Sequence, residues 1–263
     1  MVLDGLWEIA KPCLPPARVR PQGGGVANID DEAVFAAIVY VLVSGCVWRA
    51  LPPCFGASKS TVYRRFLIWS RAGVWGRLHH KVLEILADRG LVGLSRAVLD
   101  SAHVWAGKGG ELAGPSPMDR GRPGSTMHVL SDANGLPLVV GVCAANVHDS
   151  LGLKPMVAHF HIGHELHGGH SQPKRLHAGT AYDLSGLRQW LCSRHIGVRI
   201  ARMGIESSDR LGRRRWVIER TISWLTGYRR LSPRYERHPR NYLAFLGLAA
   251  ALCCYKRLLK LTM

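Results

Sequence analysis

The sequence predicts a mixed α/β sheet with flanking helices, preceded by an all-helical module. In the first third of the chain, apolar residues recur at helical spacing between breaks rich in proline and glycine. From Arg96 the pattern changes to short apolar runs, two of which flank Asn134-Gly135, a strong β-hairpin signal. Strands and helices then alternate to the end of the chain, as in a sheet covered by helices. We therefore expect a helical module over 1–92 and a sheet domain over 93–263.

The helical module begins with a short helix and a glycine-rich joint, and then contains three longer helices. They are expected over 34–42, 61–69 and 74–89, with Ser58 or Ser60 as the cap of the second. Arg64 and Arg65 near the start of that second helix suggest the recognition helix of a helix-turn-helix, whose first turns face DNA. A plain helical bundle with surface arginines is the alternative.

The sheet domain is expected to begin with a strand over 97–104 that carries Asp100. A loop over 107–124 separates it from the hairpin strands at 127–132 and 136–142. The remaining elements are a helix over 151–160, a strand over 175–179, a helix capped by Asp183, a strand over 196–201, a basic helix around 213–225 and an apolar helix over 243–255. The last run is shorter than the ~20 residues that span a bilayer, so we expect it to be a core helix.

The basic helix carries a single carboxylate, Glu219, between arginines and two tryptophans. Arg215 and Glu219 lie one turn apart, so we expect them on one face, with Glu219 buried among the arginines. Arginine binds phosphate oxygens well, and a carboxylate beside it can hold a divalent cation against phosphate. The alternative is an ion-paired surface helix with Trp216 and Trp224 anchored in the core.

The charge balance favours a polyanionic partner. The net charge is +17 and the pI is about 10.2, and nucleic acid is the commonest partner of such proteins. The seven cysteines contain no Cys-x-x-Cys pair, which favours buried thiols in a reducing compartment. The amino-terminal residues do not fit a signal peptide. We therefore expect a cytoplasmic, nucleoid-associated protein without a membrane partner.

A histidine-rich segment over 159–177 raises the question of a metal site. His161, His164 and His167 have His-x-x-His spacing, but glycines intervene and no carboxylate or cysteine completes a ligand set. We interpret the segment as a surface loop rich in histidine.

Several motifs, joined in this order, resemble the bacterial insertion-sequence DDE transposases of the four/five insertion-sequence group. The resemblance covers nearly the whole chain and is most specific in Arg215-x-x-x-Glu219-Arg220. The other motifs are Gly45-Cys46-Val47-Trp48-Arg49-Ala50-Leu51-Pro52, Tyr63-Arg64-Arg65-Phe66, Leu99-Asp100-Ser101, Asp132-Ala133-Asn134-Gly135, His148-Asp149-Ser150 and Ala181-Tyr182-Asp183.

This resemblance implies an RNase H-like catalytic domain that cleaves DNA ends and transfers strands. The family's chemistry uses two Mg²⁺ (or Mn²⁺) ions held by three acids. Asp100 and Glu219 match two of those acids and are the implied catalytic and metal-binding residues. The implied partners are double-stranded DNA, both element ends and target, and further copies of the chain. The predicted DNA contacts are Arg64, Arg65, Arg215, Arg220, Arg229 and Arg230.

The chain departs from the family pattern at the second acid. Gly179 occupies that position, and Thr180 and Thr126 stand where the family carries lysine. Glycine cannot ligate a cation, and Asp183 could replace the missing acid only if the chain shifted. We therefore expect a transposase whose chemistry is impaired or lost. The alternatives are a non-catalytic relic that occupies or represses element ends, and a nuclease of the same fold.

Overall fold

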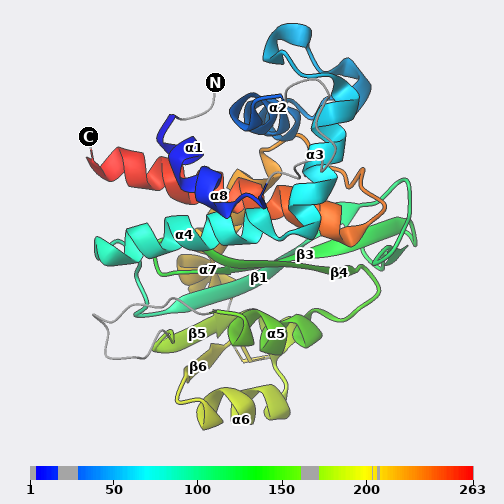
Figure 1. Cartoon of the computed structure of the whole chain (residues 1–263). Coiled ribbons are helices and arrows are strands. Elements are labelled where there is room, and N and C mark those ends of the chain that lie inside the picture. Colours follow the sequence, from blue (N-terminus) through cyan, green and yellow to red (C-terminus); the bar gives the residue numbers. More distant parts are fainter. Residues whose placement is uncertain (1–3, 17–28, 161–171, 203, 206–207, 263) are drawn as a thin grey trace.

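The computed structural model describes residues 4–16, 29–160, 172–202, 204–205 and 208–262. Its centre is a mixed sheet (Figure 1) in which β4, β3, β1, β5 and β6 lie side by side, with the short β2 also paired to β3. The β4–β3 and β3–β1 pairs are antiparallel, whereas β5 and β6 run parallel to β1. The strands are β1 Ala97–Trp105, β2 Gly114–Pro115, β3 Pro123–Ser131, β4 Pro137–Ala144, β5 Arg175–Ala178 and β6 Gly197–Ile200.

Helices precede the sheet and cover it, so the predicted fold class is confirmed. Within the described residues they are α1 Asp4–Ala10, α2 Asp31–Ser44, α3 Lys59–Arg71, α4 Val74–Asp88, α5 Leu153–Ala158, α6 Ser185–Ser193, α7 Ser208–Thr226 and α8 Pro239–Thr262. The expected helix over 151–160 is shorter than predicted, because its first turn is the 3₁₀ helix Asp149–Gly152. The predicted loop over 107–124 contains β2 and the start of β3.

Local sequence signals set the ends of the first helices. The Asp30 side chain accepts a hydrogen bond from the backbone N–H of Glu32, and Gly45 ends α2 in the left-handed conformation. The Ser58 side chain caps α3 by accepting from the N–H of Thr61. The connection over 45–58 is longer than the three- or four-residue turn of a helix-turn-helix.

Strand register decides which residues meet which helices. Asp100 pairs with Val129 and Val129 with Val140, so these three side chains share one face of the sheet. That face meets α7 and α8. The opposite face carries Ser101 and His128 and meets α5, because the ring of His128 lies against Gly152.

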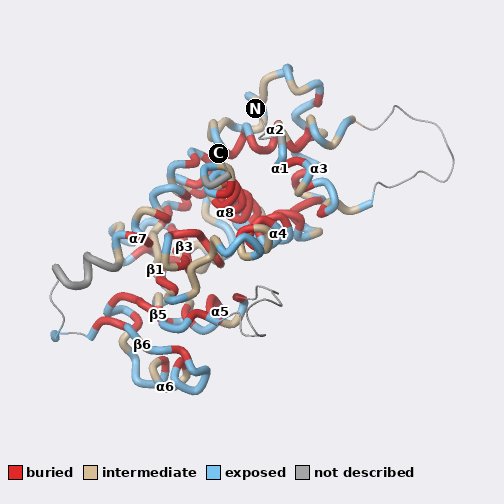
Figure 2. The backbone as a smooth tube through the Cα atoms, turned by 90° about the vertical axis from the view of Figure 1, so that its left-hand side faces the viewer, coloured by how far each residue is buried: buried red, intermediate tan, exposed pale blue. Residues whose placement is uncertain are grey.

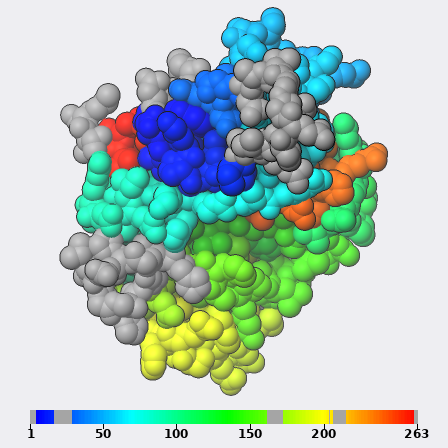
Figure 3. Space-filling view, viewed as in Figure 1, coloured from blue at the N-terminus to red at the C-terminus, as the bar shows by residue number. Residues whose placement is uncertain are grey.

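Helix α8 joins the helical module to the sheet. Figure 2 shows it as a mostly buried helix beside α4, and Figure 3 shows the carboxy-terminal segment beside the amino-terminal one. One hydrophobic core runs through α2, α3, α4, α8 and the sheet. Residues 239–260 are long and apolar enough to cross a membrane, but 72% of their most apolar window is buried inside the protein. This burial confirms the predicted core helix, and the two-domain division at residue 93 stays a prediction.

The hairpin turn locks α7 onto the sheet. The buried carboxylate of Asp132 accepts hydrogen bonds from the N–H groups of Asn134 and Leu136, which fixes the turn. The Thr221 hydroxyl then donates to the Gly135 carbonyl over 2.7 Å, and Arg220 donates to the Asn134 carbonyl over 2.7 Å. The turn therefore sets the position of the helix that carries Glu219.

The cysteines are all free, but they are less uniformly buried than predicted. Cys13 and Cys254 are buried, whereas Cys54 and Cys192 are exposed. Cys54 follows directly after Pro53 in a short 3₁₀ helix on the surface, where no core packs against it.

Candidate active site

Asp100 is paired with an arginine from the basic helix. It projects from the middle of β1 toward α7, where Arg215 donates a hydrogen bond to its carboxylate over 2.8 Å. Burial works against the charged guanidinium, but the hydrogen bond and charge of Asp100 outweigh it and raise the pKa of Arg215. The structure thus joins two predicted site residues that lie 115 positions apart in the chain.

Gly179 lies one residue past the end of β5, the strand next to β1. The parallel register of the two strands ends at the pair Leu99 and Ala178, and Asp100 and Gly179 are the residues that follow. A Cβ atom at Gly179 would lie 3.4 Å from a terminal nitrogen of Arg215. The Arg215 guanidinium therefore borders the space that a side chain at 179 would fill, and the alignment of Gly179 with the second acid stays a prediction.

Glu219 is exposed, which corrects the prediction that it is buried among arginines. It lies one turn after Arg215, and its negative charge acts on that guanidinium together with Asp100. The Arg215 guanidinium thus interacts with both predicted site acids, Asp100 and Glu219. The prediction failed because helical spacing gives the angle between side chains but not which side of the helix packs inward.

The two tryptophans of α7 are exposed as well, so they are not core anchors. Trp216 is 49% exposed and Trp224 is 41% exposed. The Arg220 guanidinium lies between them, 4.5 Å and 4.7 Å from the two ring centroids. This cation–π arrangement fixes Arg220 on the outer surface of the helix.

Asp149 approaches the same strand from the opposite face. The Ser101 hydroxyl donates to its carboxylate over 2.7 Å. Burial, and then the negative charge of Asp149, raise the pKa of the neighbouring Tyr182. Because successive strand residues face opposite ways, Asp149 lies on the other face of the sheet from the Asp100 side chain. Sequence reasoning missed this pair, although His148-Asp149-Ser150 was one of the motifs.

Asp183 is engaged elsewhere. Its carboxylate forms an ion pair with Arg188 over 2.7 Å, and Arg188 also donates to the Ile200 carbonyl. The predicted helix cap is wrong, because α6 begins at Ser185 after Leu184 without a side-chain cap.

The predicted DNA-contact arginines have different environments. Arg64 and Arg229 are exposed, and Arg65 is ion-paired with Asp31 over 3.0 Å. Arg230 is only 5% exposed and forms a buried ion pair with Glu236 over 2.6 Å. Its structural role removes Arg230 from the surface available to DNA.

The donor set does not fit a metal centre held by three acids. Within the described parts of the chain, no group of three or more His, Cys, Asp or Glu side chains could hold a metal ion. Asp100 is neutralised by Arg215, and Gly179 offers no ligand. Residues 161–171 of the histidine-rich segment lie outside the described residues.

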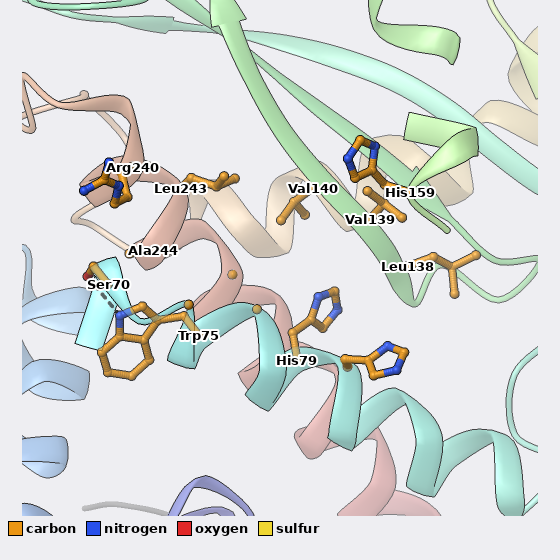
Figure 4. Close-up of a pocket in the computed structure, with 14 residues that line it drawn as sticks. Ser70, Trp75, His79, Leu138, Val139, Val140, His159, Arg240, Leu243 and Ala244 are labelled. Carbon is orange, nitrogen blue, oxygen red and sulfur yellow. Dashed lines mark hydrogen bonds between the residues drawn. The ribbon is translucent and has the colours of Figure 1, made fainter. Parts of the chain in front are cut away.

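A separate cavity of about 340 Å³ lies between α4, β4 and α8 (Figure 4). Leu138 and Val140 line one side, and Trp75 and His79 line the other. Its lining contains neither Asp100 nor Glu219, so the cavity is separate from the acidic site.

Comparisons with known proteins agree with these features. Residues 2–79 match the family described as "Putative transposase of IS4/5 family", and residues 94–254 match the family described as "Transposase DDE domain". The "Putative transposase for insertion sequence element IS402" of Burkholderia cepacia is 39% identical over 172 residues, which are 65% of this chain and 80% of that protein.

Two further similarities are more limited. The "Insertion element IS402 uncharacterized 16.2 kDa protein" of Burkholderia cepacia is 35% identical over 116 residues, which are 43% of this chain and 79% of that protein. A pre-cleavage Mos1 transpososome aligns over 91% of this chain and 82% of that one, with 10% identity and a TM-score of 0.30, too low to carry a structural argument.

The family assignment rests on the sequence match, which spans the whole sheet and the basic helix. It includes Asp100 on β1, Gly179 after β5 and Glu219 on α7. The family uses divalent metal ions for phosphoryl transfer on DNA. The chain belongs to the insertion-sequence transposases with a DDE domain, a family of enzymes.

Proposed function

We propose that this chain binds the DNA ends of an insertion element and that its strand-cleaving site is impaired. The proposal rests mainly on one observation: Gly179, which aligns with the family's second acid, follows the strand next to β1 and has the Arg215 guanidinium beside it. In-line transfer at phosphorus needs cations held by carboxylates. Asp100 and Glu219 are the two acids that remain for this role.

The positive charge of Arg215 balances the negative charges of Asp100 and Glu219 in the absence of a third acid. Its guanidinium neutralises Asp100 through a 2.8 Å hydrogen bond and is attracted by Glu219. An ion that approached Asp100 would have to compete with this fixed positive charge. In an active site the Arg215 guanidinium would bind phosphate. In this chain it is instead paired with Asp100.

DNA binding does not depend on the missing acid. The net charge of +17 favours a polyanion, and the candidate contacts are the exposed Arg64 and Arg229 and the half-buried Arg215 and Arg220 of α7. Double-stranded DNA is the proposed partner, with further copies of the chain at paired ends, in the cytoplasm at the nucleoid. The Asp100–Arg215 pair also favours a second function, in which the chain occupies element ends as a repressor without cutting them.

Restoring the acid tests the proposal. The natural chain, Gly179→Asp and Gly179→Asn are compared for binding and for Mg²⁺- or Mn²⁺-dependent cleavage of a duplex carrying the element's ends. Asparagine matches aspartate in size without its charge. We expect all three to bind, with affinity falling steeply as salt rises, and only Gly179→Asp to cut.

Two results would contradict this expectation. Cleavage by the natural chain, abolished by Glu219→Gln, would mean that the site is intact without an acid at 179. Absence of salt-dependent binding by the natural chain would remove DNA as the partner. Circular dichroism of each variant confirms that the chains compared are folded.

A further inference from the structure

A basic, aromatic groove lies next to the acidic site, at the carboxy-terminal ends of α7 and α8. Its volume is about 700 Å³. Val43 and Cys253 contribute apolar surface, and Trp224 and Tyr228 contribute aromatic rings. Lys256, Arg257 and Lys260 supply positive charge, and no acidic side chain is among the described residues that line it. The groove is therefore suited to an anion with an apolar part.

The three cations of α8 are crowded within little more than one turn. Lys256, Arg257 and Lys260 are all exposed. Like charges four positions apart on a helix repel each other, so Lys256 and Lys260 destabilise the isolated helix. The Lys256 ammonium lies 3.4 Å from the Tyr228 hydroxyl and 5.3 Å from its ring centroid, contacts that do not cancel its charge. An anionic partner would remove this repulsion.

The aromatic side of the groove belongs to an exposed stack on α7. Trp216, Arg220 and Trp224 are spaced one turn apart, with the guanidinium between the rings. Trp224 lines the groove, so a flat group bound there would extend the stack. Nucleobases are such groups, and their stacking on aromatic side chains is independent of sequence.

The groove is continuous with the acidic site along one helix. Ser223, which also lines it, lies one turn after Glu219. A DNA strand that passes Glu219 would therefore reach Trp224 within two turns of the helix. Bases are available for stacking only where the strand is unpaired.

We propose that the α7–α8 groove binds an unpaired stretch of DNA, with a base stacked on Trp224 and its phosphates held by Lys256, Arg257 and Lys260. This proposal rests on the DNA binding proposed above and adds the strand state and its site. A second copy of the chain does not suit the groove, because each copy carries a net charge of +17. An acidic peptide would satisfy the cations but would leave the tryptophan stack unused.

The test compares single-stranded and double-stranded DNA binding by fluorescence anisotropy, using a labelled oligothymidylate and a labelled duplex. Trp224→Leu keeps an apolar side chain but removes the stacking surface, and we expect it to weaken oligothymidylate binding by about tenfold. The triple variant Lys256→Gln, Arg257→Gln, Lys260→Gln should reduce the salt slope of oligothymidylate binding by about 2.

A matched control removes the same charge elsewhere. Arg71, Arg175 and Arg199 are exposed on α3, β5 and β6, away from the groove, and their replacement by glutamine lowers the net charge equally. This triple variant should keep the affinity for oligothymidylate within about twofold of the natural chain. An equal loss of affinity for oligothymidylate in both triple variants would mean that net charge alone explains the effect. This result would overturn the proposal.

Other outcomes separate this proposal from the proposed function. If the groove variants bind oligothymidylate as the natural chain does, while the natural chain still binds duplex, the groove assignment is wrong and the proposed function stands. If the natural chain binds neither DNA, both fail. Polyglutamate is added as a competitor of oligothymidylate. If it competes equally well on the natural chain and on Trp224→Leu, the groove is a general anion site, and the base-stacking role is overturned.

Discussion

His79 should make the stability of the protein fall at mildly acidic pH. It lies on α4 behind β4 and α8, where its ring Nε2 is 2.7 Å from the Pro137 carbonyl (Figure 4). Nε2 is also 3.9 Å from the Cys254 thiol of α8. Burial, opposed by the Pro137 hydrogen bond, lowers the pKa of His79 from 6.5 to about 4. Protonation would place a positive charge in the core, where burial disfavours it.

The sign and size of the effect follow from these two pKa values. In the unfolded chain His79 binds a proton below its ordinary pKa of 6.5, whereas in the folded chain it stays neutral until about 4. The stabilisation is therefore fully present above pH 6.5 and is lost as pH falls toward 4. At about 1.4 kcal/mol per pKa unit, the free energy of unfolding should fall by about 2–3 kcal/mol between about pH 7.5 and about pH 4.5.

The assay is urea unfolding of the natural chain and His79→Gln at both pH values. Glutamine can still donate to the Pro137 carbonyl but does not titrate, so the variant should lose about 2–3 kcal/mol less than the natural chain on acidification. His80→Gln is the control, since His80 is 45% exposed beside Glu84 on the same helix. Equal pH dependence in the natural chain and His79→Gln would refute the reasoning.

Two further substitutions test the contacts that hold α7 and α8 in place. Gly135 has φ +90°, and an added Cβ would lie 2.9 Å from the Thr221 hydroxyl, so Gly135→Ala should lower the free energy of unfolding by about 1–3 kcal/mol. Urea unfolding against Gly186→Ala, an open helical position that should be neutral or slightly stabilising, checks this, and equal effects would contradict it. Glu236→Gln leaves Arg230 buried without its counter-charge and should cost about 3–5 kcal/mol. A loss below about 1 kcal/mol in thermal unfolding, the range of a surface pair, would contradict the buried role.

The sheet could be predicted because its sequence signals are local. The Asn134-Gly135 turn and the apolar runs around it place β3 and β4 to within a few residues. The caps at Asp30 and Ser58 likewise mark the starts of α2 and α3. Such signals depend only on residues that are close in the sequence, so they can be recognised without knowledge of the fold.

Burial on the basic helix could not be predicted in the same way. Spacing puts Trp216, Arg220 and Trp224 on one side of α7, but a tryptophan stripe is typical of a core-facing surface. The core side is instead set by Thr221, which reaches the hairpin turn 86 positions earlier. The burial of Arg230 could not be predicted either. Its side chain is of a type that is usually exposed, but here it is hydrogen-bonded to Glu236 and to the Cys46 carbonyl inside the protein.

The contacts that hold α7 do not involve the acids proposed for the active site. Helix α7 is held by Thr221 at the hairpin turn, and the chain after it is anchored by the Arg230–Glu236 pair. Gly179 places no carboxylate beside the Arg215 guanidinium, which is already paired with Asp100. The proposed loss of catalysis would therefore leave the fold intact, and the proposed groove along α7 and α8 depends on cations and aromatic rings that do not belong to that site.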